Sequence, residues 1–405
     1  MIKQWIVFFA LVLVIVPAAS QAEQFAVVGP RALGMGGASV AAVNDSTAVY
    51  WNPAALADVR VVDIRIPAAA GLADHVGLKD TWSKINDINA QVQAGDPAAI
   101  NETIRLLQDL DKPDTGADIN ASAGLLVSIP IAKSAIAISA LGFGYAGLYP
   151  TVDTLNIQPN PTVPGPSPNP NFVGNNNTAV TGIGIVAKEP AVSLATSFAD
   201  TVFIGVNAKM IYADTYVNTK TLRSNTFNTF FDDLKKSKTG TNKAALDAGI
   251  LYVPVQSFRV GLVGRDLNSP SFPVEGVFAQ KQVNGDVTRI TKIDEVKFDP
   301  QCRAGVAWLP LKTFTLAVDY DLTRNKTLTP GYEDRTAAIG LEKTFLSEYI
   351  NLRIGAYKNT ADSSARTVYT AGLGLRLFAL RLDFAGAYDF DERQAQASVD
   401  LALRF

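Results

Sequence analysis

The residue types that most often carry catalysis or bind metals are scarce in this sequence. Its 405 residues include one histidine, His75, and one cysteine, Cys302. A nucleophilic serine needs a base, usually a histidine, and no serine motif accompanies His75. A single thiol allows neither an intramolecular disulfide nor a thiolate metal cluster. We therefore expect no catalytic residue, cofactor site or metal site, and no enzymatic activity.

Charged residues are spaced differently, because they occupy every second position of several segments. Between Leu380 and Phe390, Arg381 and Asp383 alternate with large apolar residues. Successive side chains of a strand point to opposite faces, so one face of such a strand is charged and the other apolar. In a closed tube the charged face would line the interior. The charges predicted to lie in a lumen are Asp319, Asp321, Arg353, Arg376, Arg381, Asp383, Asp389, Asp400 and Arg404.

These lumen charges have two interpretations. They are either cross-strand ion pairs that fill the interior and hold a plug, or a polar path along which a substrate or an ion slides. A role in nucleic-acid binding is not expected, since the net charge is −2 and no run of lysine and arginine is present.

Long alternating segments must position these charges. The chain is 48% hydrophobic, yet after residue 22 it has no uninterrupted run of about eighteen apolar residues, which a membrane helix would need. The other fold that can span lipid is a closed barrel, because each backbone amide needs an internal partner there. The predicted strands are 59–72, 118–130, 132–148, 178–197, 199–217, 241–255, 257–268, 287–309, 312–325, 332–344, 348–359, 365–378, 380–391 and 394–405.

This pattern predicts an all-β fold, a transmembrane antiparallel barrel of about 14 strands over residues 59–405. The tube would be apolar outside and ionic within, with Cys302 on the outer face in phase with Trp308. Connections alternate between short turns and longer loops, as in outer-membrane barrels. A soluble β-rich periplasmic domain is the alternative, but its strands are typically shorter than the about ten residues that a tilted membrane strand needs.

Both ends of the chain indicate export and assembly in a membrane. Residues 1–22 combine a charged start, a short apolar block, Pro17 and small residues, which predicts a signal peptide. Residues 398–405 alternate and end in Phe405. This ending resembles the terminal strand that the outer-membrane barrel assembly machinery recognises, so Phe405 is the predicted assembly signal.

Two loops have distinctive compositions. Residues 81–110 show helical spacing, with Asp96 and Pro97 at the start of a second helix, which predicts a helical loop. Its apolar stripe either packs against its own partner helix and the barrel rim or binds a ligand. Residues 149–177 are rich in proline and asparagine and poor in apolar groups, which predicts an exposed external loop.

Residues 23–58 carry a motif that does not match a phosphate loop, since no Gly-Lys-Ser/Thr follows its glycines. Glycines and an Asn-Pro turn suit close backbone packing inside a crowded barrel. The motif residues are Gly34, Met35, Gly36, Gly37, Asp45, Tyr50, Trp51, Asn52 and Pro53. The motif resembles the N-terminal hatch of FadL-type outer-membrane barrels, and most closely the conjugal-transfer TraF-like branch.

This resemblance implies a barrel of the Gram-negative outer membrane, with residues 23–58 as a hatch in the lumen. It also implies uptake of hydrophobic small molecules, such as long-chain fatty acids. The alternative is a structural or docking component of a conjugal-transfer or secretion assembly. Expected partners are outer-membrane lipid, the barrel assembly machinery during insertion, and a hydrophobic ligand or envelope assembly proteins. No cofactor and no nucleic acid are expected.

Overall fold

The computed structural model describes most of residues 25–405. The described residues are 25–405 except 75–76, 78–80, 82–83, 85–86, 89, 93, 95, 112–114, 154–176, 222–228, 276–280, 284–285, 289–293, 330–331, 347 and 391–393. The predicted signal peptide, His75 and most of the proline-rich loop therefore lie outside the described residues.

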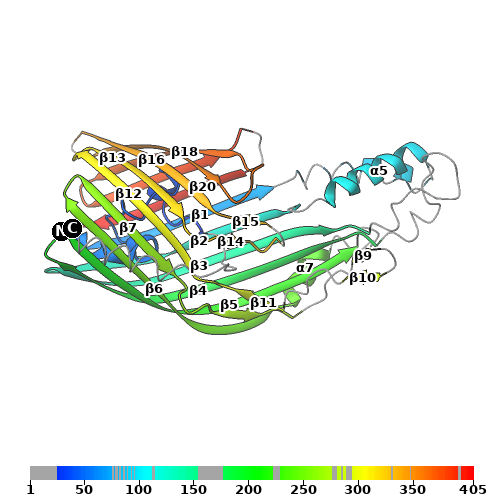
Figure 1. The fold of residues 1–405 in the computed structure, drawn as a ribbon, viewed down its shortest axis with the longest axis horizontal. Helices are drawn as coiled ribbons and strands as arrows, with labels where there is room; N and C mark the ends of the chain where they lie inside the picture. The colour runs from blue at the N-terminus through cyan, green and yellow to red at the C-terminus, as the bar shows by residue number, and fades with distance from the viewer. Residues whose placement is uncertain are drawn as a thin grey trace, which may run out of the picture.

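Fourteen antiparallel strands close into one barrel, in which each strand pairs with its neighbours and β1 pairs with β20. The predicted all-β antiparallel barrel of about 14 strands is thus confirmed (Figure 1). The barrel strands are β1 Asp63–Asp74, β2 Ala117–Ile131, β3 Ser134–Thr151, β4 Ala179–Phe198, β5 Val202–Thr221, β6 Thr239–Val255, β7 Phe258–Arg265, β12 Gln301–Leu311, β13 Phe314–Asp321, β16 Thr336–Phe345, β17 Ile350–Asn359, β18 Thr367–Leu377, β19 Leu380–Tyr388 and β20 Gln394–Arg404.

The two ends of the barrel differ. Short turns join the strands at the end that carries the C-terminus, which we call the turn end. Longer connections leave the opposite end, the loop end, where β3 to β6 extend beyond the shorter strands (Figure 1). Left-handed backbone at Ala199 and Phe378 allows the tight turns between β4 and β5 and between β18 and β19.

Three small hairpins accompany the barrel. They pair β8 Ser271–Pro273 with β11 Glu295–Lys297, β9 Lys281–Val283 with β10 Asp286–Thr288, and β14 Asn325–Lys326 with β15 Glu333–Asp334. The single strand predicted over 287–309 is therefore wrong, because its first part pairs in these hairpins. Pro300 has no amide hydrogen to continue a ladder, and the barrel strand β12 begins at Gln301.

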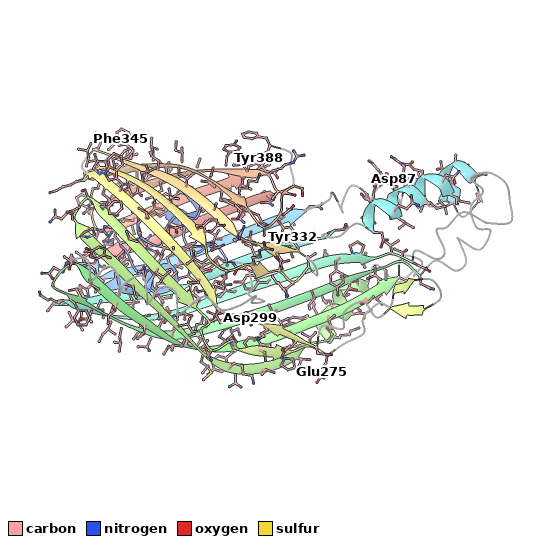
Figure 2. The ribbon with its side chains drawn as sticks, in the orientation of Figure 1. Asp87, Glu275, Asp299, Tyr332, Phe345 and Tyr388 are labelled. Carbon is pink, nitrogen blue, oxygen red and sulfur yellow. The ribbon has the colours of Figure 1, made fainter. Side chains whose placement is uncertain are left out.

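The outward faces of the strands are apolar. Phe345 at the turn end and Tyr388 toward the loop end both project from the outer surface (Figure 2). Other exposed aromatic residues at the turn end include Phe198, Trp308 and Phe378. A continuous apolar exterior would be unfavourable in water and is what a lipid-facing barrel presents.

The described helices are short, and none is long and apolar enough to cross a membrane. The predicted helix start at Pro97 is present in α5 Pro97–Leu110, whose Asp96 side chain accepts a hydrogen bond from the Ala98 amide at 2.9 Å. This helix lies at the loop end, where Leu107 and Leu110 pack in one cluster with Ala117 of β2 (Figure 1). The first part of the predicted helical loop is only partly described, and α7 Phe230–Lys236 lies beside β5.

Candidate functional site: an inner segment and its ionic belt

Residues 25–58 lie inside the barrel, and we call them the inner segment. They contain α2 Pro30–Gly34, α3 Ala48–Trp51 and the 3-10 helix η1 Pro53–Asp58. Helix η1 packs on β4, β5 and β6, while α2 packs on the other side against β18, β19 and β20. The segment thus spans the lumen, as the dark blue ribbon within the wall shows (Figure 1).

An aromatic cluster forms the centre of the inner segment. The rings of Phe25 and Trp51 stack at 6.4 Å between centroids, and Tyr50 meets Trp51 edge to face at 5.2 Å. The Trp51 indole Nε1 donates to the Val28 carbonyl at 2.8 Å, so its one polar group is satisfied. Phe143 of β3 contacts Tyr50, which joins this cluster to the barrel wall.

Asn52 and Pro53 dock the inner segment on one side of the wall. The Asn52 amide nitrogen donates to the carbonyls of Val40 and Ile250 at 3.0 and 3.2 Å. Its side-chain oxygen accepts from the Ala54 amide at 3.1 Å and caps η1. A Cβ at Gly205 or at its cross-strand partner Gly249 would collide with Pro53 or Asn52, so only glycine allows this approach.

Gly34, Met35 and Gly36 dock on the opposite side. The Gly36 amide donates to Thr370 Oγ1 at 3.0 Å, and that hydroxyl donates to the Gly34 carbonyl at 3.1 Å. Gly36 has a φ of +68°, a conformation that disfavours any residue with a Cβ. Gly37, with a φ of +87°, continues the turn.

The wall glycines in contact with the inner segment form a series around the barrel. A Cβ added at any of them would come within 3.2 Å of an inner-segment atom. We call this series the glycine track. Its members are Gly205, Gly249, Gly261, Gly305, Gly340, Gly355 and Gly372, on β5, β6, β7, β12, β16, β17 and β18.

Charged groups form a second set of contacts, which we call the ionic belt. Asp319 of β13 accepts hydrogen bonds from the amides of Ser39 and Val40 at 2.7 and 2.8 Å. Arg31 of the inner segment forms a two-pronged pair with Glu342 of β16, with its Nη2 at 2.8 Å. A bidentate arginine–carboxylate pair has a defined geometry. The Arg31–Glu342 pair therefore helps to hold the inner segment in one position.

The belt continues along the closing strands. Arg353 of β17 binds both Glu342 and Asp383. Arg65 of β1 binds Asp400 at 2.5 Å and lies 3.5 Å from Asp45 of the inner segment. Burial alone would raise the pKa of Asp45, but Arg65 and Arg31 hold it well below its usual range.

On the far side of the lumen the belt centres on Lys209 of β5. Its ammonium group lies 2.8 Å from Asp266 and 3.3 Å from both Glu189 and Asp247. Asp247 also accepts from Asn207 at 2.9 Å. An unpaired charge is costly in a protein interior. Loss of Lys209 would therefore leave its buried carboxylate partners without their shared counter-charge.

Two arginines of the belt lie over aromatic rings of the inner segment. The Arg265 guanidinium carbon is 3.9 Å from the centre of the Tyr50 ring, and that of Arg303 is 4.0 Å from the Phe25 ring. Arg303 also pairs with Asp321 at 2.5 Å. Cation–π contacts of this kind gain strength when water is excluded.

The predicted site residues lie in several parts of the barrel. Most of the motif residues are buried in the inner segment, and Asp319, Asp321, Arg353, Asp383 and Asp400 are buried in the belt. Asp389 is buried farther toward the loop end, whereas Arg376, Arg381 and Arg404 lie at the turn end. Phe405 is 68% exposed and pairs with Val62 at the seam between β1 and β20.

Sequence reasoning missed more than half of the belt. Outside the strands it missed Arg31 and Asp266. The residues missed on the strands are Asp63, Arg65, Glu189, Lys209, Asp247, Arg265, Arg303 and Glu342. Each shares the two-residue period of its strand, so the same alternation could have found it. Their partners are distant in sequence, and the pairing itself carries no local signal.

The prediction that the interior is ionic is wrong for part of the lumen. Toward the loop end the lumen contains a second, apolar cluster from β3, β4, β5, β8 and the segment before β12. Its large members include Tyr149, Ile183, Ile185, Ile211, Phe272 and Phe298. Alternation of polar and apolar residues identifies the face of a strand that points into the lumen. Where both faces of a strand are apolar, this signal is missing, and alternation cannot predict that the lumen is apolar there.

The prediction of a lipid-facing Cys302 is also wrong, since its side chain is buried. Cys302 pairs in register with Gly264, and the Leu267 side chain lies over that glycine on the outer face. Among the described residues, no group of three or more histidine, cysteine or acidic residues is arranged to hold a metal ion.

Comparison with solved structures finds the same fold in several channels. The Ralstonia pickettii toluene transporter TbuX aligns with a TM-score of 0.53 and 13% identity over 93% of this chain and 98% of its own. A TodX monoaromatic hydrocarbon channel mutant gives 0.51 and 10% over 93% and 97%. The CymD monoaromatic hydrocarbon channel gives 0.50 and 13% over 95% and 98%.

Sequence comparison gives the family. No curated protein matches the chain. The family model described as "F plasmid transfer operon, TraF, protein" matches residues 49–321, which is more than half of the chain. The resemblance to the TraF-like branch is confirmed by this match, and the solved structures show the same barrel fold. The chain therefore belongs to the TraF protein family of the F plasmid transfer operon.

Proposed function

We propose that this protein is an outer-membrane barrel of the Gram-negative type that takes part in the uptake of hydrophobic small molecules. The apolar exterior between the turn end and the loop end supports a position in lipid. The C-terminus would then lie on the periplasmic side and α5 outside the cell. The fold shared with a toluene transporter and with monoaromatic hydrocarbon channels supports the proposal.

The observation that carries this proposal is the apolar lining of the lumen toward the loop end. Ile183 and Ile185 of β4 and Ile211 of β5 face inward and are fully buried against Phe272. A passage for ions or sugars would present polar groups there, whereas binding sites for hydrophobic ligands are mainly apolar. We infer that the ligand enters at the loop end and meets this cluster first.

The inner segment is the proposed hatch. It fills the lumen below the apolar cluster and is held by the ionic belt and the glycine track. Because these contacts are specific and mostly polar, they define one closed position, and a shift of residues 25–58 would open a path along the lumen charges.

The experiment uses two adjacent residues of β4 that point to opposite faces. Cells that lack other hydrocarbon channels would express the full chain, Ile185→Thr or Val186→Thr, and the initial rate of toluene uptake would be measured. Ile185 faces the lumen and Val186 the exterior. We expect the chain to raise uptake, Ile185→Thr to lower it several-fold, and Val186→Thr to leave it unchanged. Equal uptake with and without the chain would refute the proposal.

A second function, docking in a conjugal-transfer or secretion assembly, is favoured by the family match and by the position of α5. This amphipathic helix buries Leu107 and Leu110 in a cluster that includes Ala117 of β2, and it turns its charged face outward. Such a helix is well placed to meet another envelope component.

Transfer of an F-type plasmid between cells tests this second function. Removal of residues 81–110 should lower transfer frequency strongly while toluene uptake and barrel folding stay normal. If transfer frequency is the same with the full chain, the shortened chain and no chain, the docking function is excluded.

A further inference from the structure

Three arginines from neighbouring strands face one another at the turn end of the lumen. Arg376 of β18 lies directly opposite Arg381 of β19 in the antiparallel register. Arg381 in turn is paired with Ala402 of β20, and Arg404 lies two residues farther on the same inward face. Like charges directly opposite across a strand pair destabilise it, so this cluster needs anions for balance.

The carboxylates available to the cluster are shared. Glu348, in the turn between β16 and β17, lies 2.7 Å from Arg376 and 3.5 Å from Arg381. Asp63 lies 3.2 Å from Arg404 and 3.4 Å from Arg65. Glu348 is therefore shared by Arg376 and Arg381, and Asp63 is shared by Arg404 and Arg65.

Arg381 has donor capacity to spare. Its side chain is only 19% exposed, and its buried Nε has no hydrogen-bond partner among the described residues. A buried donor without an acceptor is unfavourable, so an added acceptor there would be stabilising. The inner segment adds further polar groups, because Arg404 donates to the Asn44 carbonyl and Arg31 to the Asn44 side-chain oxygen at 3.2 and 3.3 Å.

Glu348 is held loosely compared with the arginines that it contacts. Its side chain is 56% exposed, and its backbone is left-handed, with a φ of 75°. An exposed ion pair is weak and can exchange with solvent or with another anion. Glu348 thus occupies guanidinium groups that an incoming anion could use.

We propose that Arg376, Arg381 and Arg404 form a binding site for an oxyanion, the carboxylate or phosphate group of a small molecule, at the turn end of the lumen. The planar guanidinium groups suit such oxygens, which they bind in pairs. Glu348 is the internal competitor that covers the site when no ligand is bound. The site depends on the barrel alone and stands whether or not the protein carries hydrocarbons.

Calorimetric titration of the purified full chain in detergent tests the site, with inorganic phosphate and benzoate as separate probes. We expect binding of at least one probe, and Arg376→Gln and Arg381→Gln should each weaken it about tenfold or more. Glu348→Gln should tighten it, because the competitor is gone. Lys133→Gln is the control, since it removes an exposed positive charge at the same end.

The two probes separate the sources of the anion. Binding of phosphate alone assigns the site to phosphate groups, and binding of benzoate alone assigns it to carboxylates. Absence of binding for both, unchanged binding in the two arginine variants, or no tightening in Glu348→Gln would overturn the proposal. Heat-modifiable gel mobility reports whether each variant folds, and Arg381→Lys, which keeps the charge but not the fork, should bind with intermediate strength if Arg381→Gln does not fold.

Discussion

At the scale of single residues, the contacts of the inner segment are of two kinds. Glycines permit backbone to approach backbone, and charges fix where the segment stops. Asp319 holds the amides of Ser39 and Val40, while Gly340 lies against the main chain of Met35. A larger side chain at a glycine would collide with the inner segment. A neutral side chain in place of a charged one would leave its buried partner without a counter-charge.

Substitution of a glycine-track residue should loosen the inner segment without unfolding the barrel. In Gly340→Ala the new Cβ would collide with the Met35 backbone, an overpacking that costs about 1–3 kcal/mol. The control is Gly144→Ala, where the new Cβ meets nothing within 4 Å. Hydrogen-exchange protection of peptides from residues 25–58 should fall in the first variant only. Equal protection in both variants would contradict the steric role of the track.

Asp45 should make attachment of the inner segment dependent on pH in one direction. Its pKa is held well below the ordinary value of about 3.9. A depressed folded-state pKa stabilises the folded form above that ordinary value, and the contribution is lost as pH falls through the lower folded value. Wild-type protection of residues 25–58 should therefore persist from neutral pH to near pH 4 and decline in stronger acid.

Asp45→Asn should lack this contribution at every pH, because it leaves Arg65 without one of its buried partners. Removal of one member of a buried ion pair costs about 3–5 kcal/mol. Asp200→Asn, an exposed residue paired with Lys133, is the matched control. After correction for the intrinsic exchange rate at each pH, an acid response of Asp45→Asn that matches wild type would rule out the assignment.

At the scale of elements, the closing seam joins β1 to β20 and ends in the pairing of Val62 with Phe405. Both backbone hydrogen bonds of that pair are present, at 2.9 and 3.1 Å. The last residue thus completes the ladder that closes the tube, and its ring projects outward. The predicted role of Phe405 in assembly can therefore be tested by substitution of its side chain.

Phe405→Ala should reduce assembly in cells more than it reduces stability after assembly. Phe378→Ala is a suitable control, because Phe378 is an exposed aromatic residue at the same end but lies in an internal turn. The amount of heat-modifiable barrel in outer-membrane fractions should fall clearly for Phe405→Ala and little for Phe378→Ala. Similar losses in both variants would point to general interfacial anchoring instead of a terminal signal.

Sequence patterns predicted the strands correctly where one face of the strand is polar and the other apolar. The segment predicted over 380–391 is β19 Leu380–Tyr388, because charge and apolar groups alternate along it. The prediction over 287–309 failed because a local pattern does not show that residues 295–297 pair with 271–273. Only part of the ionic belt was predicted, because its ion pairs also join residues that are distant in sequence. The pairing of Arg31 with Glu342 joins residues 311 positions apart, which only the closed fold brings together.

At the scale of the whole molecule, the barrel encloses the inner segment, so the proposed passage of a solute through the lumen depends on movement of that segment. The wall has continuous strand pairing around the barrel. The contacts at the glycine track and the belt lie between two parts of one chain and can separate without breaking that pairing. Movement of the inner segment is therefore the least disruptive route to an open lumen.

A reversible cross-link tests this movement directly. A Cβ at Gly305 would lie 3.0 Å from the Val40 Cβ and closer still to Asp319 Oδ1. A disulfide needs about 3.8 Å between its two Cβ atoms, so the inner segment must give way by under an ångström, and Gly305→Cys alone reports the effect of that shift. In a Cys302→Ala background, which prevents mispairing, Val40→Cys with Gly305→Cys should therefore form a bond when oxidised. Toluene uptake should then fall to the level of cells without the chain and recover on reduction, with either single cysteine variant as the control. Equal uptake in the oxidised and reduced states would show that the inner segment stays in place during transport.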